Sequence, residues 1–386
     1  MIQEFMFGMK TDIRFAPGLV RSVGEIAKEY AATKVLLAAD PGIRKTGLVD
    51  QVRESLEKAG IQIIDFDKIV PNPRISDCEE GARLGMEHHV DMVVAVGGGS
   101  SIDTAKAIAG MLGHNTTSFD VIKYPNAYTK DACPLIAIPT TAGTGSEVTT
   151  CGVITDEKNH KKEYCFDVRC APTAALCDPE VLMGLPSGIA AACGVDALTH
   201  AIEGYVCRCT NSITESLGIY AVKLLYDNFR RYIYDRDLES CEAFIVGSMM
   251  AGLSFGYSDV AAVHALAETV GGYYDIPHGV ANAIFLADVC EYSATANVEK
   301  YVNVARALGV RTELLSDREA AMAGAESIRQ LVEDVNIPKL SSFERVKPDD
   351  FEMLAKRCVQ HLSTEHNPRI LTEADYLYLL NKAYLN

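Results

Sequence analysis

The first half of the chain contains four short aliphatic runs separated by segments of helical composition. The runs cover residues 35–39, 61–65, 92–96 and 135–138. Near-continuous runs of Val, Ile, Leu and Ala are typical of strands that are buried on both faces of a parallel sheet. The alternation therefore predicts a doubly wound α/β sheet, a fold that binds ligands at the carboxyl ends of its strands.

The pattern changes after the Asp178-Pro179 pair and the Leu-Pro-Ser-Gly break at residues 185–188. Beyond this break the aliphatic runs stop, and long alanine-rich amphipathic segments continue to the C-terminus. A chain of 386 residues is long enough for two domains. We therefore predict an α/β domain over residues 1–185 and an all-α domain over residues 186–386.

Four residues of the second domain form a pattern of metal ligands. Asp196 and His200 are four residues apart in a helical segment, so their side chains leave the same face. His264 opens another helical segment and His278 follows a glycine break, so a helix and a loop can bring two more imidazoles to the same ion. One carboxylate and three imidazoles without a thiolate suit a catalytic Fe²⁺, Zn²⁺ or similar first-row ion.

A single histidine is more often a structural residue than a metal ligand. Only the grouping of these four residues favours a metal site. The remaining histidines are interpreted as structural or solvated; they are His88, His89, His114, His160, His361 and His366.

A glycine-rich turn follows the third aliphatic run, in the sequence VGGGSSIDTAKAIA at residues 96–109. Glycines let the backbone approach a ligand closely, and the free amides at a helix start attract an anion such as a pyrophosphate. Asp103 is then placed to bind a ribose or to cap the turn. The spacing is not GxGxxG, so an ordinary structural turn remains an alternative.

Two other strand ends carry polar residues. Asp40 directly follows the first run. A carboxylate at this position can accept hydrogen bonds from a ribose 2′-hydroxyl and repels a 2′-phosphate. Asp40 therefore favours NAD over NADP. The segment PTTAGTGSEVT at residues 139–149 offers hydroxyls and flexible glycines for the nicotinamide half of the cofactor. A plain Ser/Thr turn with a helix cap is the alternative.

Composition excludes several other classes of protein. A formal net charge of -16 repels nucleic-acid phosphates and anionic lipid surfaces, so we expect neither nucleic acid nor a membrane as a partner. Twelve cysteines show no CxxC pair, which favours reduced thiols in the cytosol. The start lacks a leader pattern, and no stretch is expected to be long enough to span a bilayer, so we expect a soluble cytoplasmic protein.

Seven separated motifs together resemble the iron-containing alcohol dehydrogenases. They are GGGSSIDTAKAIA, PTTAGTGSEVT, Asp178-Pro179, DALTHAIE, VHALA, PHGVANA and the NPR at residues 367–369. The resemblance covers nearly the whole chain and implies a dehydroquinate synthase-like fold, in which an α/β nucleotide-binding domain precedes a helical metal-binding and substrate domain. It also implies NAD(H) and one divalent metal, Fe²⁺ with Zn²⁺ or Mn²⁺ as alternatives, a small alcohol or aldehyde substrate, and a homodimer or larger homo-oligomer.

By this resemblance Asp196, His200, His264 and His278 are the metal ligands. Positions that contact the dinucleotide in the family correspond here to Asp40, Asn72, Gly97, Gly98, Gly99, Ser100, Asp103, Thr140, Thr141, Thr144, Ser146, Val153 and Lys162. In such an enzyme the ion polarises a carbonyl or alkoxide oxygen, and a hydride passes to or from the nicotinamide C4.

The chain departs from its relatives near the expected substrate. Many relatives read HALAH after the third ligand, where the second histidine is proposed to relay protons, but this chain reads HALAE with Glu268. Glu268 is expected either to act as the acid/base, with a pKa raised toward neutrality, or to bind a polar substrate group. An ordinary solvated glutamate is the alternative. The other expected pocket residues are Cys151, Phe255, Tyr257, Asp259 and Ser363.

The acids Glu268 and Asp259 lead us to hypothesise a polar or cationic substrate, such as a short polar-substituted primary alcohol or its aldehyde. Two alternatives share the fold. One is a zinc-dependent, glycerol dehydrogenase-like polyol oxidoreductase, and the other is an inactive relative that binds metal and NAD. The apolar segment EFMFGM at residues 4–9 is expected to form a strand that pairs across a symmetric dimer edge.

Overall fold

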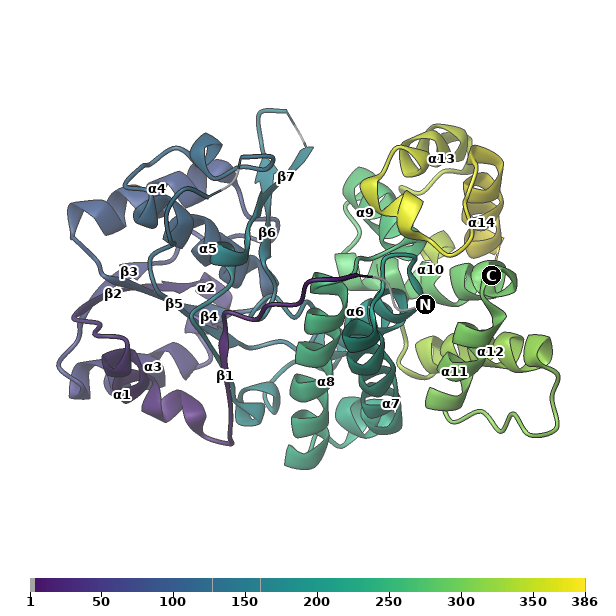
Figure 1. Ribbon diagram of the computed structural model, residues 1–386, viewed down its shortest axis with the longest axis horizontal. Helices are drawn as coiled ribbons and strands as arrows, with labels where there is room; N and C mark the ends of the chain where they lie inside the picture. Colours follow the sequence, from purple (N-terminus) through teal and green to yellow (C-terminus); the bar gives the residue numbers. More distant parts are fainter. Residues whose placement is uncertain (1–3, 127, 160, 386) are drawn as a thin grey trace. The chain divides into compact units, whose positions relative to one another are not determined.

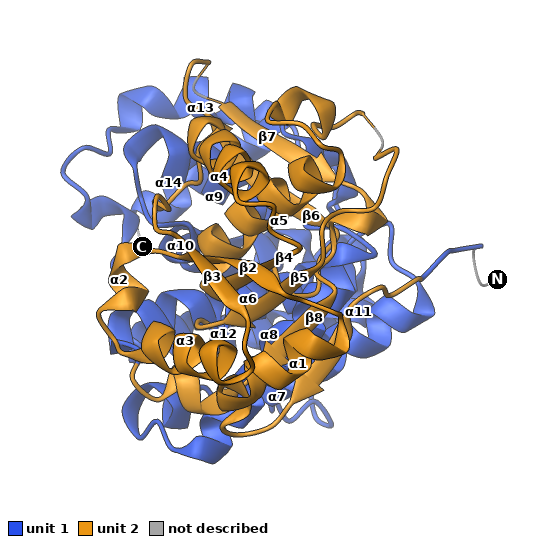
Figure 2. Cartoon of the chain, turned by 90° about the vertical axis from the view of Figure 1, so that its left-hand side faces the viewer, with its two compact units in different colours: residues 1–7, 142–144, 185–386 blue, residues 8–141, 145–184 orange. Residues whose placement is uncertain are grey.

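The computed structural model describes residues 4–126, 128–159 and 161–385, so His160 lies outside the described residues (Figure 1). The chain divides into two compact units (Figure 2). One unit contains residues 8–141 and 145–184. The other contains residues 185–386 together with two short stretches, 1–7 and 142–144.

The first unit is built on a six-stranded sheet in which all paired strands are parallel. The strand order is β1 (Asp12–Phe15), β8 (Ala174–Cys177), β5 (Leu135–Pro139), β4 (Met92–Gly97), β2 (Lys34–Ala39) and β3 (Gln62–Phe66). The four aliphatic runs correspond to β2, β3, β4 and β5, so the predicted parallel sheet is confirmed. The edge strand β1 and its neighbour β8 had no place in the prediction, because four residues are too few for a clear pattern.

Alternate residues of the central strands pack into two hydrophobic layers, one on each face of the sheet. Leu37 of β2 belongs to one layer, with Val52 of the helix α3 (Leu48–Lys58). Leu36 belongs to the other layer, with Ile108 of the helix α5 (Gly99–Gly113). Burial on both faces explains why the strands read as continuous aliphatic runs. The remaining helices of this unit are α1 (Val23–Glu29), α2 (Pro41–Arg44) and α4 (Ile75–Glu87).

An antiparallel hairpin adds a second, two-stranded sheet to this unit. It consists of β6 (Cys151–Asp156) and β7 (Lys161–Phe166), and β6 packs on α5. The buried ammonium of Lys106 on α5 donates hydrogen bonds to Thr149 Oγ1 at 2.9 Å and to the carbonyl oxygen of Cys151 at 2.7 Å. These contacts fix the loop between β5 and β6 against α5.

The second unit is helical, and its described residues contain no strand, as the sequence predicts. Its helices are α6 (Ser187–Val206), α7 (Ser212–Tyr234), α8 (Leu238–Gly256), α9 (Ala262–Tyr274), α10 (His278–Ser293), α11 (Val298–Ala307), α12 (Asp317–Asp334), α13 (Phe351–Val359) and α14 (Glu373–Leu385). Short 3₁₀ helices complete the chain: η1 (Leu19–Ser22), η2 (Phe119–Val121), η3 (Val168–Cys170), η4 (Pro179–Leu182), η5 (Ala294–Ala296), η6 (Leu340–Ser342), η7 (Pro348–Asp350) and η8 (Leu362–His366).

One sequence-based expectation about this unit is wrong. The helix α8 is long and apolar enough to cross a membrane by length and composition, although no such stretch was expected. It packs against α6 and α7, and 61% of its apolar window is buried, which is the behaviour of a core helix. Residues 4–9 form no strand within the described part of the single chain. The expected pairing of this segment is with a second copy of the chain, so it stays a prediction.

Candidate metal centre and cofactor loops

One face of α6 presents three chemically active side chains. Asp196, His200 and Glu203 lie at relative positions 0, 4 and 7, which is a single stripe on an α-helix. All three are buried. A helix that is alanine-rich on its other faces can pack closely on all sides, so this polar stripe is enclosed in the unit.

His264 in the first turn of α9 completes the buried group. Its Nε2 lies 3.0 Å from the Nε2 of His200. The ligand atoms of Asp196, His200 and His264 all lie within 4.8 Å of one another. Burial lowers the pKa of His200 to about 3, because it disfavours the imidazolium more than the charge of Asp196 favours it. His200 is thus neutral, which is the form that binds a metal.

The amide of Asn282 shows that this donor set suits a cation. Its Nδ2 lies 2.6 Å from Asp196 Oδ1, 3.3 Å from His264 Nε2 and 3.2 Å from His278 Nε2. The NH₂ group of this side chain is electropositive, and three acceptor atoms point toward it. Oxygen and nitrogen donors converging in a buried space fit a first-row divalent ion.

His278 is the most exposed of the four predicted ligands. Its Nε2 lies 3.5 Å from Asp196 Oδ1, but its side chain is 43% exposed. It begins α10, one helical turn before Asn282. The structure therefore brings the three predicted buried ligands together and places His278 at the open side of the group.

Glu203 is a functional residue that the sequence analysis missed. Its Oε2 lies 2.5 Å from His264 Nδ1, and its Oε1 accepts the backbone N–H of Val263 at 2.7 Å. A carboxylate on Nδ1 fixes the imidazole so that Nε2 faces the ligand group. Burial alone would lower the pKa of His264, but the hydrogen bond and charge of Glu203 outweigh it and raise that pKa. The seven-residue spacing from Asp196 in DALTHAIE was the available signal.

The expectation that Glu268 has a pKa raised toward neutrality is wrong. Burial does push the pKa upward, but the hydrogen bond and charge of His361 outweigh it and bring the pKa of Glu268 to about 2. His361 Nε2 lies 3.0 Å from Glu268 Oε2, and His361 Nδ1 accepts the backbone N–H of Ser363 at 3.3 Å. Sequence could not find this pair, because 93 residues separate its members. Glu268 is therefore an ionised carboxylate.

The other predicted pocket residues of the helical unit occupy different environments. Phe255 stacks on the ring of His200, with centroids 4.2 Å apart, and so covers one face of a metal ligand. Tyr257 packs against Phe7. Asp259 faces His366, with 2.9 Å between Oδ2 and Nδ1. Cys151 belongs to the other unit, at the start of β6.

The glycine turn of the α/β unit has the conformation that a close ligand approach requires. Gly97 ends β4 with a φ of 155°, and a Cβ there would lie 2.2 Å from Ser101 Oγ. α5 starts at Gly99, so the N-terminal end of this helix lies at the carboxyl edge of the sheet. Asp40 lies at the end of the neighbouring strand β2, caps α2, and accepts a hydrogen bond from Ser101 at 3.3 Å. The two predicted cofactor segments are therefore adjacent.

Asp103 connects two further predicted segments. It accepts hydrogen bonds from Ser146 Oγ at 2.5 Å and from the backbone N–H of Val153 at 3.0 Å. Both carboxylate oxygens are thus used within the protein, so its observed role is to hold the loop after β5 and the strand β6 together. A separate pair forms where Lys162 donates a hydrogen bond to Asn72 Oδ1 at 2.8 Å.

The remaining predicted cofactor residues lie on the same loops. Thr140 donates its backbone N–H to Gly97 O at 3.0 Å, and Thr141 Oγ1 approaches Gly98. Ser100 is in the first turn of α5, and Thr144 belongs to the short stretch grouped with the helical unit.

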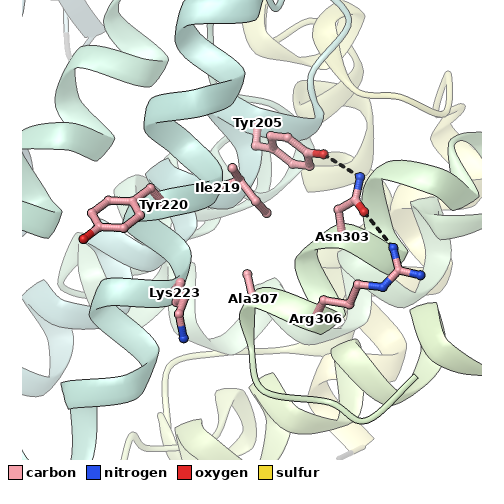
Figure 3. A pocket seen from close by; sticks show the side chains of 7 residues that line it. All are labelled: Tyr205, Ile219, Tyr220, Lys223, Asn303, Arg306 and Ala307. Carbon is pink, nitrogen blue, oxygen red and sulfur yellow. Dashed lines mark hydrogen bonds between the residues drawn. The ribbon is translucent and has the colours of Figure 1, made fainter. Parts of the chain in front are cut away.

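A pocket of about 450 Å³ in the helical unit contains none of the predicted site residues. Figure 3 shows Tyr205, Asn303 and Arg306 joined by hydrogen bonds on one side of it. The remaining lining residues are Ile219, Tyr220, Lys223 and Ala307. It is open and carries no cluster of metal-binding groups, so it is a different feature from the metal centre.

Comparison with known proteins gives a consistent set of similarities. Residues 10–179 match the family model described as iron-containing alcohol dehydrogenase, and residues 190–384 match its C-terminal counterpart. The chain is 36% identical to choline dehydrogenase of Bacillus subtilis, over 99% of this chain and 96% of that protein. It is 34% identical to NAD-dependent methanol dehydrogenase of Bacillus methanolicus, over 95% and 96%. A solved 1,3-propanediol oxidoreductase superposes with a TM-score of 0.95 at 33% identity, over 99% and 100%.

Proposed function

We propose a substrate class for this chain, which belongs to the iron-containing alcohol dehydrogenase family and is an NAD-dependent alcohol dehydrogenase or aldehyde reductase with a buried Asp/His/His metal site. The proposed substrate is a short primary alcohol with a cationic or strongly polar tail, or the matching aldehyde. The observation that carries the proposal is the ionised carboxylate of Glu268, four residues after the metal-site histidine His264 on α9. The two side chains lie about one helical turn apart on one face.

The proposed metal is Fe²⁺, held by Asp196, His200, His264 and His278. When bound, such an ion supplies Lewis-acid polarisation of the carbonyl or alcohol oxygen. The protein residues do the rest of the positioning. Glu203 holds the ring of His264, and Phe255 covers His200 and keeps water from that face. His278, at the exposed side, is the ligand that a substrate passes on entering.

The proposed NAD(H) site uses the carboxyl edge of the sheet in the α/β unit. The amides that begin α5 bind the pyrophosphate, and Asp40 binds the adenosine ribose. Asp103 acts indirectly by orienting Ser146 and β6. Lys162 and Asn72 form a polar pair that we assign to the same cofactor.

A cationic tail suits the chemistry around α9. His361 holds Glu268 in its ionised form, and with a neutral imidazole at His361 the pair carries a net negative charge. This charge attracts a cation and repels an anionic substrate. One of the similar proteins is named for choline, a short primary alcohol with a quaternary ammonium tail. Tyr257 and Phe255 supply aromatic faces in the same unit, and such faces bind ammonium groups.

Glu268 is less suited to the acid/base role. A group with a pKa of about 2 holds no proton to donate near neutral pH, and it is a weak base. We therefore assign Glu268 to substrate binding. We further propose that the enzyme acts in the cytoplasm as a homo-oligomer.

The decisive experiment measures NADH oxidation by protein loaded anaerobically with Fe²⁺, with aldehydes that carry trimethylammonium, neutral or carboxylate tails. The wild type is expected to prefer the cationic aldehyde. Glu268→Gln should lower kcat/KM for that aldehyde by at least about tenfold, about 1.4 kcal/mol, and change the neutral aldehyde little. Glu352→Gln, on the exposed face of α13, is the matched control. An unchanged ranking of tails in Glu268→Gln would contradict the proposal.

A further inference from the structure

Three segments of the helical unit bring two thiols, a carboxylate and an imidazole together at the C-terminal end of α6. Cys207 is the C-cap of α6 and Cys209 follows in the next loop. Asp259 lies between α8 and α9, and His366 ends η8. One ligand atom each from Cys209, Asp259 and His366 lies within 4.8 Å of the other two.

The distances in this cluster suit a shared cation. The two sulfur atoms are 3.7 Å apart, and thiolates on one tetrahedral zinc ion, each at about 2.3 Å, are about 3.8 Å apart. Asp259 Oδ1 accepts the backbone N–H of Val260, which leaves Oδ2 toward His366 Nδ1 at 2.9 Å. That buried Nδ1 has no aligned hydrogen bond to any described residue. The oxygen and the nitrogen thus form a close ion pair without the geometry of a hydrogen bond, and both atoms can bind a third atom.

Two sulfur atoms lie side by side at this point. Cys207 is 1% exposed, and its sulfur lies 3.7 Å from that of the exposed residue Cys209. A thiolate, and not a thiol, is the metal ligand, so a cation that binds here displaces a thiol proton.

The segments that carry Cys209, Asp259 and His366 are held in place by contacts that do not use these three ligand atoms. The backbone N–H of Arg208 donates to the carbonyl oxygen of His366 at 2.9 Å. Ser258 Oγ donates to the carbonyl oxygen of Gly204 at 3.1 Å. The cluster is therefore preorganised, which lowers the entropy cost of forming a metal site.

We propose that Cys209, Asp259 and His366 form a second cation site, of the zinc class, separate from the Asp/His/His centre, with the sulfur of Cys207 next to that of Cys209. A thiolate and an imidazole select Zn²⁺ over Mg²⁺, Ca²⁺ and Mn²⁺. The three ligands come from three different segments, so the ion acts as a structural link between them. Its effect is to tie the end of α6 to the loop before α9 and to the segment after α13.

Cobalt(II) is the probe that separates the two sites. Co²⁺ bound to thiolate gives a near-ultraviolet charge-transfer band that a nitrogen-and-oxygen site lacks. Reduced, metal-free protein is titrated anaerobically with Co²⁺. The wild type should bind two equivalents, with the thiolate band belonging to one of them. Asp196→Asn should lose the other equivalent and keep the band, so failure of the catalytic metal site and failure of this site are distinguishable.

Substitutions in the cluster complete the test. Cys209→Ser should abolish the band, whereas the matched control Cys193→Ser, on α6 but outside the cluster, should keep it. His366→Gln retains both thiols and should weaken Co²⁺ binding by at least about tenfold. The proposal is overturned if the wild type shows no thiolate band, if His366→Gln binds like the wild type, or if protein isolated without zinc contains a Cys207–Cys209 disulfide by mass spectrometry.

Discussion

At the scale of single residues, the geometry of the metal centre depends on Glu203, a carboxylate that is not itself one of the proposed metal ligands. Glu203 binds the ring nitrogen of His264 that faces away from the ligand group, and it binds the backbone just before that histidine. It therefore fixes both the side-chain orientation and the main chain of the third ligand. Partners of this kind are part of a metal site as much as its ligands are.

We expect Glu203→Gln to weaken metal binding about 10- to 100-fold, because the amide holds the imidazole less firmly and stabilises its positive polarisation less. Competition with a chelator measures the dissociation constant directly and needs no activity assay. Glu215→Gln on α7, which breaks an ion pair with Lys300, is the control and should leave metal affinity unchanged. Equal affinity of Glu203→Gln and the wild type would show that His264 is held by other contacts.

A second buried acid, Glu147, predicts a pH dependence of stability. Burial raises its pKa from 4.5 to about 7. A carboxyl whose pKa is raised by folding destabilises the native state once it must ionise, so its contribution is complete below about pH 4.5 and is lost as the pH rises through about 7. The shift corresponds to about 3 kcal/mol as an order of magnitude.

Glu147→Gln should remove this loss. Urea unfolding of wild type and variant, compared at about pH 5 and about pH 8, should show that the wild type loses about 3 kcal/mol more between the two conditions. Because the wild type and Glu147→Gln share all other titratable groups, the contributions of those groups cancel in the difference between the two pH profiles. Parallel pH profiles would mean that Glu147 stays protonated or finds a partner on ionisation.

At the scale of elements, the approach of α10 to α6 positions the ligands. Gly279 follows His278 in the first turn of α10, and a Cβ there would lie 2.3 Å from the carbonyl oxygen of Ala192 on α6. The contact partner is backbone, which cannot rotate away. The absence of a side chain at this position therefore sets the distance between the helix that carries His278 and the helix that carries Asp196.

Gly279→Ala should force the two helices apart and cost about 1–3 kcal/mol of stability, together with a loss of metal affinity. Gly272→Ala on α9 is the matched control, because nothing lies within 4 Å of a Cβ there, and it should be neutral or slightly stabilising. Thermal unfolding and metal titration of the two variants provide the measurement. A stable Gly279→Ala protein with normal affinity would contradict this account.

At the scale of the whole molecule, sequence patterns predicted the elements with strong periodicity and the ligands with fixed spacing. The runs that became β2, β4 and β5 could be predicted because burial on both faces demands aliphatic residues. The run that became β3 is short and aliphatic too, although this strand lies at the edge of the sheet and is only partly buried. The Asp196–His200 pair followed from helix geometry. The partners His361, His366 and Asn282 could not be predicted, since tertiary contacts between distant segments alone bring them to Glu268, Asp259 and Asp196.

Because all four proposed ligands of the centre lie in the helical unit, metal binding should stabilise that unit selectively. At a metal concentration 100 times the dissociation constant, the expected gain is about 2.7 kcal/mol. Hydrogen exchange should therefore slow for amides of α6, α9 and α10 on addition of metal, and remain unchanged for the strands β2 and β4. Asp196→Asn should show no such protection, and uniform slowing across both units would contradict the prediction.

The stripe on α6 also restricts how this gene can change over evolution. Asp196, His200, Glu203 and Cys207 lie at offsets of 0, 4, 7 and 11 residues, so at 3.6 residues per turn they point within about 40° of one direction. Inserting or deleting one residue between them would rotate everything beyond it by about 100°. Point substitutions elsewhere on the helix can be tolerated one at a time. The number of residues between Asp196 and Cys207, however, has to stay constant if both clusters are to keep their geometry.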